Sequence, residues 1–196
     1  MNMKIENMRK EYFPHKLSED CEIIATDKTT MRKFLTANFE RVFPKRDSTG
    51  TPQTMLVPEA RAKAIAELQE STGYNALHQE HFLFMFKGEP IGWSTGETQD
   101  FMTYYMRNSG ILPEHQKLGL YSKFLDHFSK YIERIGYERL TSQHKADNSE
   151  MLITKLKAGF VITGMDLDER WGALVRLTKF LKPDRESAFG RCFGRG

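Results

Sequence analysis

The chain has 196 residues, of which 39% are hydrophobic and 28% are charged, and its formal net charge is +3. This composition is typical of a globular domain with a full core, and it excludes disordered and fibrous chains. The basic residues are scattered among nearly as many acidic ones, so the charge suits an anionic ligand but gives no nucleic-acid-binding signature.

Several sequence features bear on the compartment. No apolar run reaches the ~18 residues that a membrane helix needs, and residues 1–6 lack the apolar core of a signal peptide. The two cysteines, Cys21 and Cys192, form neither a metal-ligand spacing nor a disulfide framework. We therefore expect a cytoplasmic protein that has no membrane segment and binds no metal.

The first elements are predicted from capping residues and helical spacing. Residues 1–20 are polar and mixed in charge, which predicts a loosely held N-terminal arm. A short strand is expected at 22–25. Thr26 or Asp27 can cap the following helix, which Pro44 ends. The apolar stripe of this helix consists of Met31, Phe34, Leu35, Phe39 and Val42.

A loop, a second helix and a hairpin come next. Residues 44–57 are rich in Pro, Thr, Ser and Gly, which predicts a loop. A helix is predicted over 59–71, with Ile65 and Leu68 facing inward. Residues 81–95 read as a hairpin, because an apolar run is followed by Lys87-Gly88-Glu89-Pro90 and a return strand. The run is apolar on both faces, so we expect a central strand covered by helices on each side.

The segment from residue 101 to 135 reads as strand, turn and helix. An apolar stretch, 101–106, leads into Arg107-Asn108-Ser109-Gly110 and Ile111-Leu112-Pro113. A polar turn follows at 114–119. From Tyr121 to Ile135 the apolar residues recur every three to four positions, as on one helical face. Such a turn points unpaired N–H groups and the positive end of a helix dipole at one place, which suits an anion.

The remaining elements complete a mixed sheet. A strand is expected at 138–143, then a short helix that Asn148 or Ser149 caps and Gly159 ends. Two strands follow at 160–165 and 173–181, and residues 182–196 are predicted to be a frayed C-terminal tail. The order β-αα-βββ-α-β-α-ββ predicts one mixed α/β domain over residues 21–181.

This order and two motifs resemble the GCN5-related N-acetyltransferase (GNAT) superfamily over Cys21 to Leu181. The pyrophosphate loop of that family reads Q/R-x-x-G-x-G/A after a V-x-P step. Here the step is Ile111-Leu112-Pro113, and the loop is Gln116-Lys117-Leu118-Gly119-Leu120-Tyr121. Tyr121 replaces the last small residue of the pattern.

A second block is also similar to the family. Family members often show N-x-x-A-x-x-x-Y followed by Gly-Phe at the end of the short helix. This chain has Asn148, Met151, Lys155 and then Gly159-Phe160. Lys155 therefore stands where the family often places the tyrosine that protonates the leaving thiolate.

The resemblance implies a GNAT-like mixed central sheet flanked by helices. It implies direct transfer of an acetyl group from acetyl-CoA to a primary amine of a small molecule or peptide, without a covalent enzyme intermediate. It also allows a homodimer. The residues expected to bind coenzyme A are Gly110, Ile111, Leu112, Gln116, Lys117, Leu118, Gly119, Leu120, Tyr121 and Asn148.

The proton transfers are the least clear part of the site. We predict Tyr105 and Lys155 as catalytic residues, and Tyr104 and Arg107 as residues that contact the acceptor. A tyrosine of pKa ~10 is a poor base, so Tyr105 would orient the amine or pass its proton through water. Other candidate groups for this step are Glu97, Asp100, His78 and His81.

Each of these residues also has a plainer interpretation. Tyr104 and Tyr105 could be core aromatics, Lys155 a solvated lysine, Arg107 an ion-pair partner and Asn148 only a helix cap. At the level of function, the alternatives are a non-catalytic acyl-CoA sensor or scaffold and, ranked last, an RNA-directed acetyltransferase.

Overall fold

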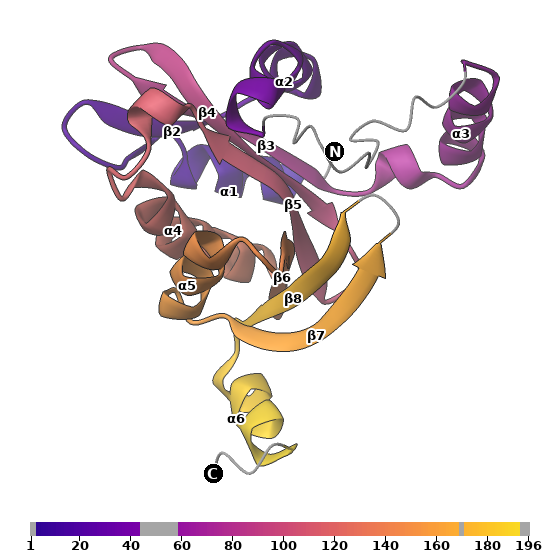
Figure 1. The fold of residues 1–196 in the computed structure, drawn as a ribbon, viewed down its shortest axis with the longest axis vertical. Coiled ribbons are helices and arrows are strands. Elements are labelled where there is room, and N and C mark those ends of the chain that lie inside the picture. The colour runs from indigo at the N-terminus through magenta and orange to yellow at the C-terminus, as the bar shows by residue number, and fades with distance from the viewer. Residues whose placement is uncertain (1–2, 44–58, 169–170, 193–196) are drawn as a thin grey trace.

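The computed structural model describes residues 3–43, 59–168 and 171–192 (Figure 1). Its strands form one sheet in the spatial order β1-β2-β3-β4-β5-β6-β8-β7. Neighbouring strands are antiparallel except β5 and β6, which run parallel. The strands are β1 (His15–Lys16), β2 (Cys21–Ala25), β3 (Gln79–Phe86), β4 (Glu89–Thr98), β5 (Thr103–Ile111), β6 (Arg139–Lys145), β7 (Val161–Asp168) and β8 (Gly172–Phe180).

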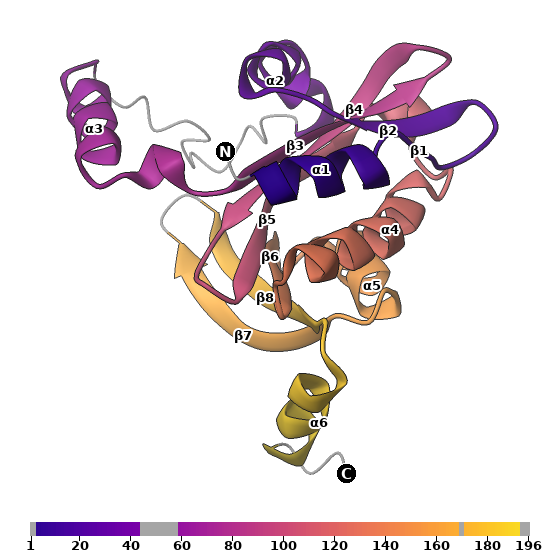
Figure 2. The same cartoon turned by 180° about the vertical axis from the view of Figure 1, so that it is seen from behind.

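Helices lie on both faces of the sheet (Figures 1 and 2). The inner face is covered by α1 (Met3–Tyr12), α4 (Leu120–Ile135) and α5 (Ser149–Lys157). The outer face is covered over β3 and β4 by α2 (Lys28–Val42). Two helices project from the body, α3 (Glu59–Ser71) and α6 (Pro183–Cys192). Two 3-10 turns are η1 (Tyr74–Ala76) and η2 (Pro113–His115).

The core has two layers because side chains alternate along the central strands. On the inner face, Phe82 and Phe84 of β3 pack against Phe124 of α4. On the outer face, Leu83 of the same strand packs with Trp93 under α2. The prediction of a central strand with helices on both sides is therefore confirmed, as is the mixed α/β fold class.

Local signals place most elements correctly. α2 begins after Asp27, whose carboxylate accepts the N–H groups of Thr29 and Thr30 at 2.8 and 2.9 Å, as expected of an N-cap. α4 ends at Ile135, and its C-cap residue Gly136 has a φ of 123°. Among the described helices, none is long and apolar enough to cross a membrane.

The prediction of a loosely held arm over residues 1–20 is wrong from Met3 onward. Residues 3–12 form α1, which packs on α4, and the side chains of Met8, Phe13 and Leu17 are buried. Arg9 of α1 binds the Glu80 carboxylate with two hydrogen bonds of 2.8 and 3.0 Å. A charged partner 71 positions away fixes this helix, and no local pattern could reveal it.

Two further expectations need correction. Ile65 and Leu68 of α3 do not face inward, because they are 42% and 61% exposed. The C-terminal tail is not frayed over 183–192, since α6 holds Phe189 against Phe180 with ring centroids 5.1 Å apart. Arg185 of α6 also donates to Glu138 at 2.6 Å. The loop expected at 44–57 lies outside the described residues.

Candidate functional site

Strands β5 and β6 separate at the centre of the sheet. Their parallel pairing runs from Thr103 and Arg139 to Met106 and Ser142. Both strands continue beyond this point, to Ile111 and Lys145, but no described pairing links the two continuations. The result is a wedge between two strands, with main-chain groups of residues 107–111 along one edge. Such an edge can accept an extended ligand by hydrogen bonds.

A β-bulge lies where the wedge opens. Thr95 of β4 pairs with Asn108 and Gly96 pairs with Met106, so Arg107 is the extra residue. The bulge thus lies in the segment Arg107-Asn108-Ser109-Gly110 that follows the apolar stretch of the strand. The guanidinium of Arg107 binds the Glu97 carboxylate at 2.8 and 3.0 Å and lies 3.2 Å from the Tyr74 hydroxyl. Arg107 therefore has the ion-pair partner that its plainer interpretation requires.

The turn before α4 exposes the backbone of the helix start. Lys117 and Gly119 have φ values of 63° and 70°, in the left-handed region. Gly119 is the N-cap residue and offers no side-chain cap, so the first N–H groups of α4 have no intrahelical partner. A Cβ at Gly119 would meet nothing within 4 Å. This open, uncapped helix start suits a phosphate group.

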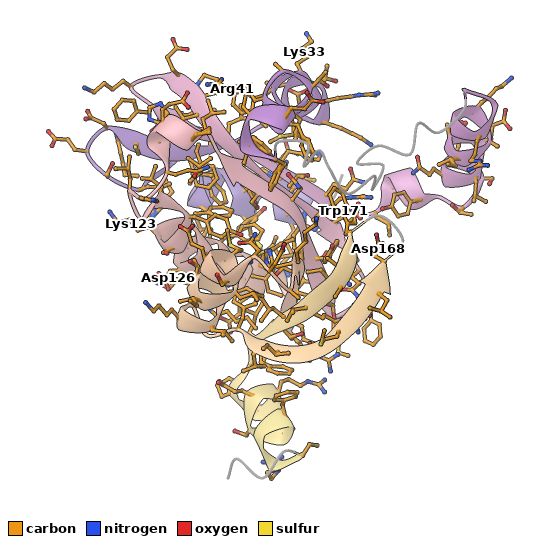
Figure 3. The ribbon with its side chains drawn as sticks, in the orientation of Figure 1. Lys33, Arg41, Lys123, Asp126, Asp168 and Trp171 are labelled. Carbon is orange, nitrogen blue, oxygen red and sulfur yellow. The ribbon has the colours of Figure 1, made fainter. Side chains whose placement is uncertain are left out.

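Neighbouring contacts hold this turn in place. Gln116 Nε2 donates to the carbonyl oxygen of Ile111 at 2.8 Å, so the turn is fastened to the end of β5. Glu114 of η2 binds Arg41 of α2 at 2.6 Å, and Figure 3 shows Arg41 at that helix. Leu112 is buried, whereas Leu118 is 56% exposed. The turn therefore has a fixed base and an exposed tip.

Lys155 of α5 points into the protein and is fully buried. Its Nζ donates to Met106 Sδ at 3.1 Å and lies 4.3 Å from the centroid of the Phe160 ring. Burial, with a smaller contribution from the charge of Lys179, lowers its pKa to about 7. The plainer interpretation of Lys155 as a solvated lysine is wrong. Lys155 lies beside Met106, the last residue of β5 that pairs with β6.

Tyr121 shares this environment. Its ring lies 5.6 Å from Lys155 Nζ, and its hydroxyl interacts with Ser109 of β5. Burial raises the pKa of Tyr121 to about 12. The replacement of a small loop residue by tyrosine thus fills the space between α4 and the wedge with an aromatic ring.

Three of the predicted ligand-contact residues make structural contacts within the protein. Tyr104 was expected to contact the acceptor, but it is fully buried on the inner face, where the Glu80 N–H donates to its hydroxyl at 3.2 Å. It is a core aromatic. Gly110 lies against α2, since a Cβ there would come within 2.9 Å of Trp93 and Val42. Asn148 Oδ1 accepts the Met151 N–H at 3.2 Å, which is the helix-cap interaction.

Tyr105 lies on the outer face at the mouth of the wedge. Its hydroxyl donates to Gln143 Oε1 at 3.2 Å, and burial raises its pKa. Gln143 in turn donates to Asp166, which also binds Arg176. A tyrosine with a raised pKa does not act as a base at neutral pH, so Tyr105 can only orient or relay.

The other candidate bases are engaged elsewhere. Glu97 is held by Arg107 and Tyr74. His78 binds Glu80 at 2.7 Å, and His81 binds Thr95 at 2.8 Å. Asp100 accepts the Met102 N–H at 2.8 Å. Among the described residues, no group of three or more His, Cys, Asp and Glu side chains could hold a metal ion.

The sequence interpretation missed His144. It lies on β6 beyond the last pair with β5, and its Nε2 is 3.2 Å from Ser142 Oγ. Burial, together with the nearby charge of Lys155, lowers its pKa to about 3, so it is neutral at pH 7. The alternation of Leu140, Ser142 and His144 was the available signal, but the predicted strand, 138–143, ended one residue before His144.

The comparisons show the fold to which this arrangement belongs. No protein-family model matches the chain, and no curated protein matches it significantly in sequence. Among solved structures, it is similar to RimL, a ribosomal L7/L12 alpha-N-protein acetyltransferase in complex with coenzyme A. The TM-score is 0.59 and the identity 15%, over 84% of this chain and 96% of that one.

Two other structures give a similar result. A GNAT family acetyltransferase from Elizabethkingia anophelis with acetyl-CoA bound has a TM-score of 0.55 and 15% identity, over 83% of this chain and 99% of that one. The spermidine/spermine N-acetyltransferase SpeG from Vibrio cholerae has a TM-score of 0.59 and 13% identity, over 88% and 99%. At these identities the likeness shows the fold, which is that of the GNAT acetyltransferases.

Proposed function

We propose that the protein is an acetyl-CoA-dependent N-acetyltransferase that transfers an acetyl group directly to a primary amine. The observation that carries this proposal is the wedge between β5 and β6, with the uncapped start of α4 at its open end and Lys155 at its apex. The likeness to solved acetyltransferases with coenzyme A or acetyl-CoA bound supports it.

The proposed binding mode assigns the coenzyme A substrate to two sets of backbone groups. The turn from Gln116 to Tyr121 would hold the diphosphate through the N–H groups of Leu118, Gly119 and Tyr121, aided by the dipole of α4. The edge formed by Gly110, Ile111 and Leu112 would hold the pantetheine arm. Asn148, which caps α5, would lie along the opposite side of that arm.

Lys155 is proposed as the acid that protonates the leaving thiolate. A group with a pKa of about 7 is partly protonated at neutral pH. An ordinary thiol has a pKa of ~8.5, so transfer of a proton from Lys155 to a thiolate is downhill. The role thus uses a group whose pKa lies near the operating pH, which is the most effective range for an acid catalyst.

The acceptor is proposed to approach from the outer face, beside Tyr105 and Arg107. Tyr105 would orient the amine, whereas Arg107 would hold the Glu97 side chain in place beside the acceptor. RimL is an acetyltransferase of a ribosomal protein, and SpeG is an acetyltransferase of spermidine and spermine. Acceptors of both kinds, peptide amines and small amines, belong in the first test.

The test measures thiol release from acetyl-CoA with a panel of peptides, amino acids and polyamines, together with coenzyme A binding by calorimetry. Gly119→Glu should abolish binding, because it places a carboxylate where the diphosphate would lie and strains a residue with a φ of 70°. Ser122→Glu, one turn into the same helix start, controls for an added charge. Binding that survives Gly119→Glu would contradict the loop assignment, and binding without any turnover would favour the sensor reading.

A further inference from the structure

A cavity of about 420 Å³ lies on the outer face of the sheet, at the end away from α2. Its floor is made by β5, β6, β8 and β7, and α6 contributes one wall through Arg185, Phe189 and Cys192. The floor is polar, because Arg139, Thr141 and Thr178 face this side. Neither the resemblance nor the proposed transfer chemistry uses this cavity.

Arg139 is the exceptional residue of the cavity. Its Nε is buried without a hydrogen-bond partner, the only buried side-chain polar atom in the described part of the chain with this property. Among the described residues, no carboxylate lies within ion-pair distance of its guanidinium. Burying a donor without a partner costs free energy, and Arg139 lines the cavity without a carboxylate partner, so a ligand in the cavity can supply the missing acceptor.

The other charged side chains around the cavity have partners within the protein. Arg176 binds Asp166 at 2.6 Å, and Arg185 binds Glu138 at 2.6 Å. The only acidic residue in the lining is Asp100, whose carboxylate accepts the Met102 N–H. One unmatched guanidinium near one carboxylate suits a ligand group with a single negative charge. A carboxylate fits the forked donors of arginine, which can bind both oxygens at once.

The cavity continues toward the proposed acceptor site. A second cavity, of about 180 Å³, is lined by Tyr105 and Gln143, and it shares Gln99, Thr141 and Arg176 with the larger one. The two form one trough along the outer face. From Ser142, where β5 and β6 separate, to Arg139 is three residues of one strand, which spans roughly 10 Å.

We infer that the acceptor is an amine that also carries a carboxylate roughly 10 Å away, and that Arg139 binds this carboxylate. This inference rests on the proposed acetyl transfer. An extended tripeptide with a free C-terminus has this span between its amine and its carboxylate, because each residue adds at most about 3.5 Å. The rings of Phe180 and Phe189 favour an apolar side chain beside the carboxylate. A polyamine has no group for Arg139.

The experiment compares Gly-Gly-Phe with its C-terminal amide, two peptides that differ in one charge. In the wild type, kcat/KM for the acid should exceed that for the amide by at least about tenfold, mainly through KM. Arg139→Gln should reduce this ratio to near one without lowering kcat/KM for the amide. Arg139→Lys should keep part of the preference, and Arg134→Gln, at an exposed arginine of α4, should keep all of it.

Direct binding separates this inference from the proposed function. Calorimetry with coenzyme A present should show tighter binding of the acid, and Arg139→Gln should remove the difference. If both peptides are acetylated equally, or if spermidine is preferred, the Arg139 inference is overturned while the acetyltransferase stands. If the acid binds through Arg139 but no acetyl group is transferred, the carboxylate site stands and the acetyltransferase proposal falls. Preference for a phosphorylated amine over the acid would overturn the choice of carboxylate.

Discussion

Glu80 and Lys155 are both buried on the inner face of the sheet, and their surroundings are opposite. Glu80 of β3 is 1% exposed and receives hydrogen bonds from Arg9, His78 and Tyr131. Lys155 of α5 is 0% exposed and has only a thioether and aromatic rings around its ammonium group. One charge is fully matched and the other is not.

The pKa values follow from these surroundings. Burial raises the pKa of Glu80, but the hydrogen bonds of His78, Arg9 and Tyr131 outweigh it and hold the pKa below its ordinary value. No such bonds offset the burial of Lys155, whose pKa falls to about 7. A matched buried charge fastens α1 to the sheet, whereas an unmatched one is a group that can exchange a proton near neutral pH. Perturbed groups of the second kind are candidates for function.

The largest effect is expected from breaking the matched charge. Glu80→Gln should destabilise the protein by about 3–5 kcal/mol, because it leaves the Arg9 guanidinium half-buried against a neutral amide. Urea unfolding at pH 7 measures this loss. A variant as stable as the wild type would show that Glu80 does not fasten α1.

The Glu80 carboxylate also makes the stability of the wild type depend on pH in the acidic range. Because the folded pKa of Glu80 is lowered, its contribution is present above its unfolded pKa of ~4.3 and is lost as the pH falls through the folded pKa. Glu80→Gln should therefore flatten the loss of stability below pH 4.5.

The opposite sign is expected for the unmatched charge. Lys155→Met should stabilise the protein by about 3 kcal/mol at pH 6, because the folded state no longer holds a buried ammonium group. The folded pKa lies below the unfolded value, so the wild type loses stability as the pH falls from ~10.5 to about 7. The gain should shrink toward pH 10. A gain that does not change with pH would mean that packing, and not charge, is responsible.

A smaller effect is expected on turnover, where the apparent activation free energy should rise by about 1.4 kcal/mol per pH unit. If Lys155 is the acid, kcat at saturating acceptor should fall about tenfold between pH 7.5 and 8.5 as the ammonium group loses its proton. Lys155→Tyr should move this fall above pH ~10, the ordinary pKa of tyrosine, because burial at this position raises the pKa of a phenol. Rate profiles of the two proteins that descend at the same pH would exclude Lys155 as the acid.

The smallest effect provides the baseline for the comparison. Lys130 and Asp126 form a 2.7 Å ion pair on α4 in which both side chains are more than half exposed, and Figure 3 labels Asp126 on the outside of that helix. Lys130→Ala should change stability by about 0.3 kcal/mol, since water screens such pairs. Chemical unfolding in low and high salt measures it. A loss of several kcal/mol would show that exposure is not what separates Glu80 from surface charges.

Local sequence signals were sufficient to predict the central elements, but they were insufficient to predict how the two ends of the chain pack. The capping of α2 by Asp27 and the helical period of α4 are properties of neighbouring residues, and both were predictable. The docking of α1 depends on Arg9 and Glu80, and that of α6 on Arg185 and Glu138, which are distant in sequence. α3 shows the converse, since its bounds were predicted but its apolar residues Ile65 and Leu68 are exposed.

The same distinction between local signals and distant packing applies to the candidate site. The turn around Gly119 and the position of Lys155 follow from motif spacing. The burial of Lys155, the core position of Tyr104 and the unmatched Nε of Arg139 depend on what packs around them. A polar alternation of Arg139, Thr141 and Gln143 was visible in the sequence, but only the sheet order reveals that their face is open beneath α6.

The extra residue in β5 has a consequence for comparing this chain with any other. Before Arg107, odd-numbered residues such as Thr103 and Tyr105 face the outer side of the sheet. After Arg107, even-numbered residues face that side, because Asn108 accepts a hydrogen bond of 2.6 Å from the outer-face residue Trp93. The bulge is thus a change of parity in the strand. An alignment that shifts by one position there would exchange the two faces for every residue from 108 to 111. A one-residue deletion at Arg107 would remove the bulge and restore regular alternation, with Met106 and Ser109 still on the inner face, so Ser109 would keep its side toward Tyr121.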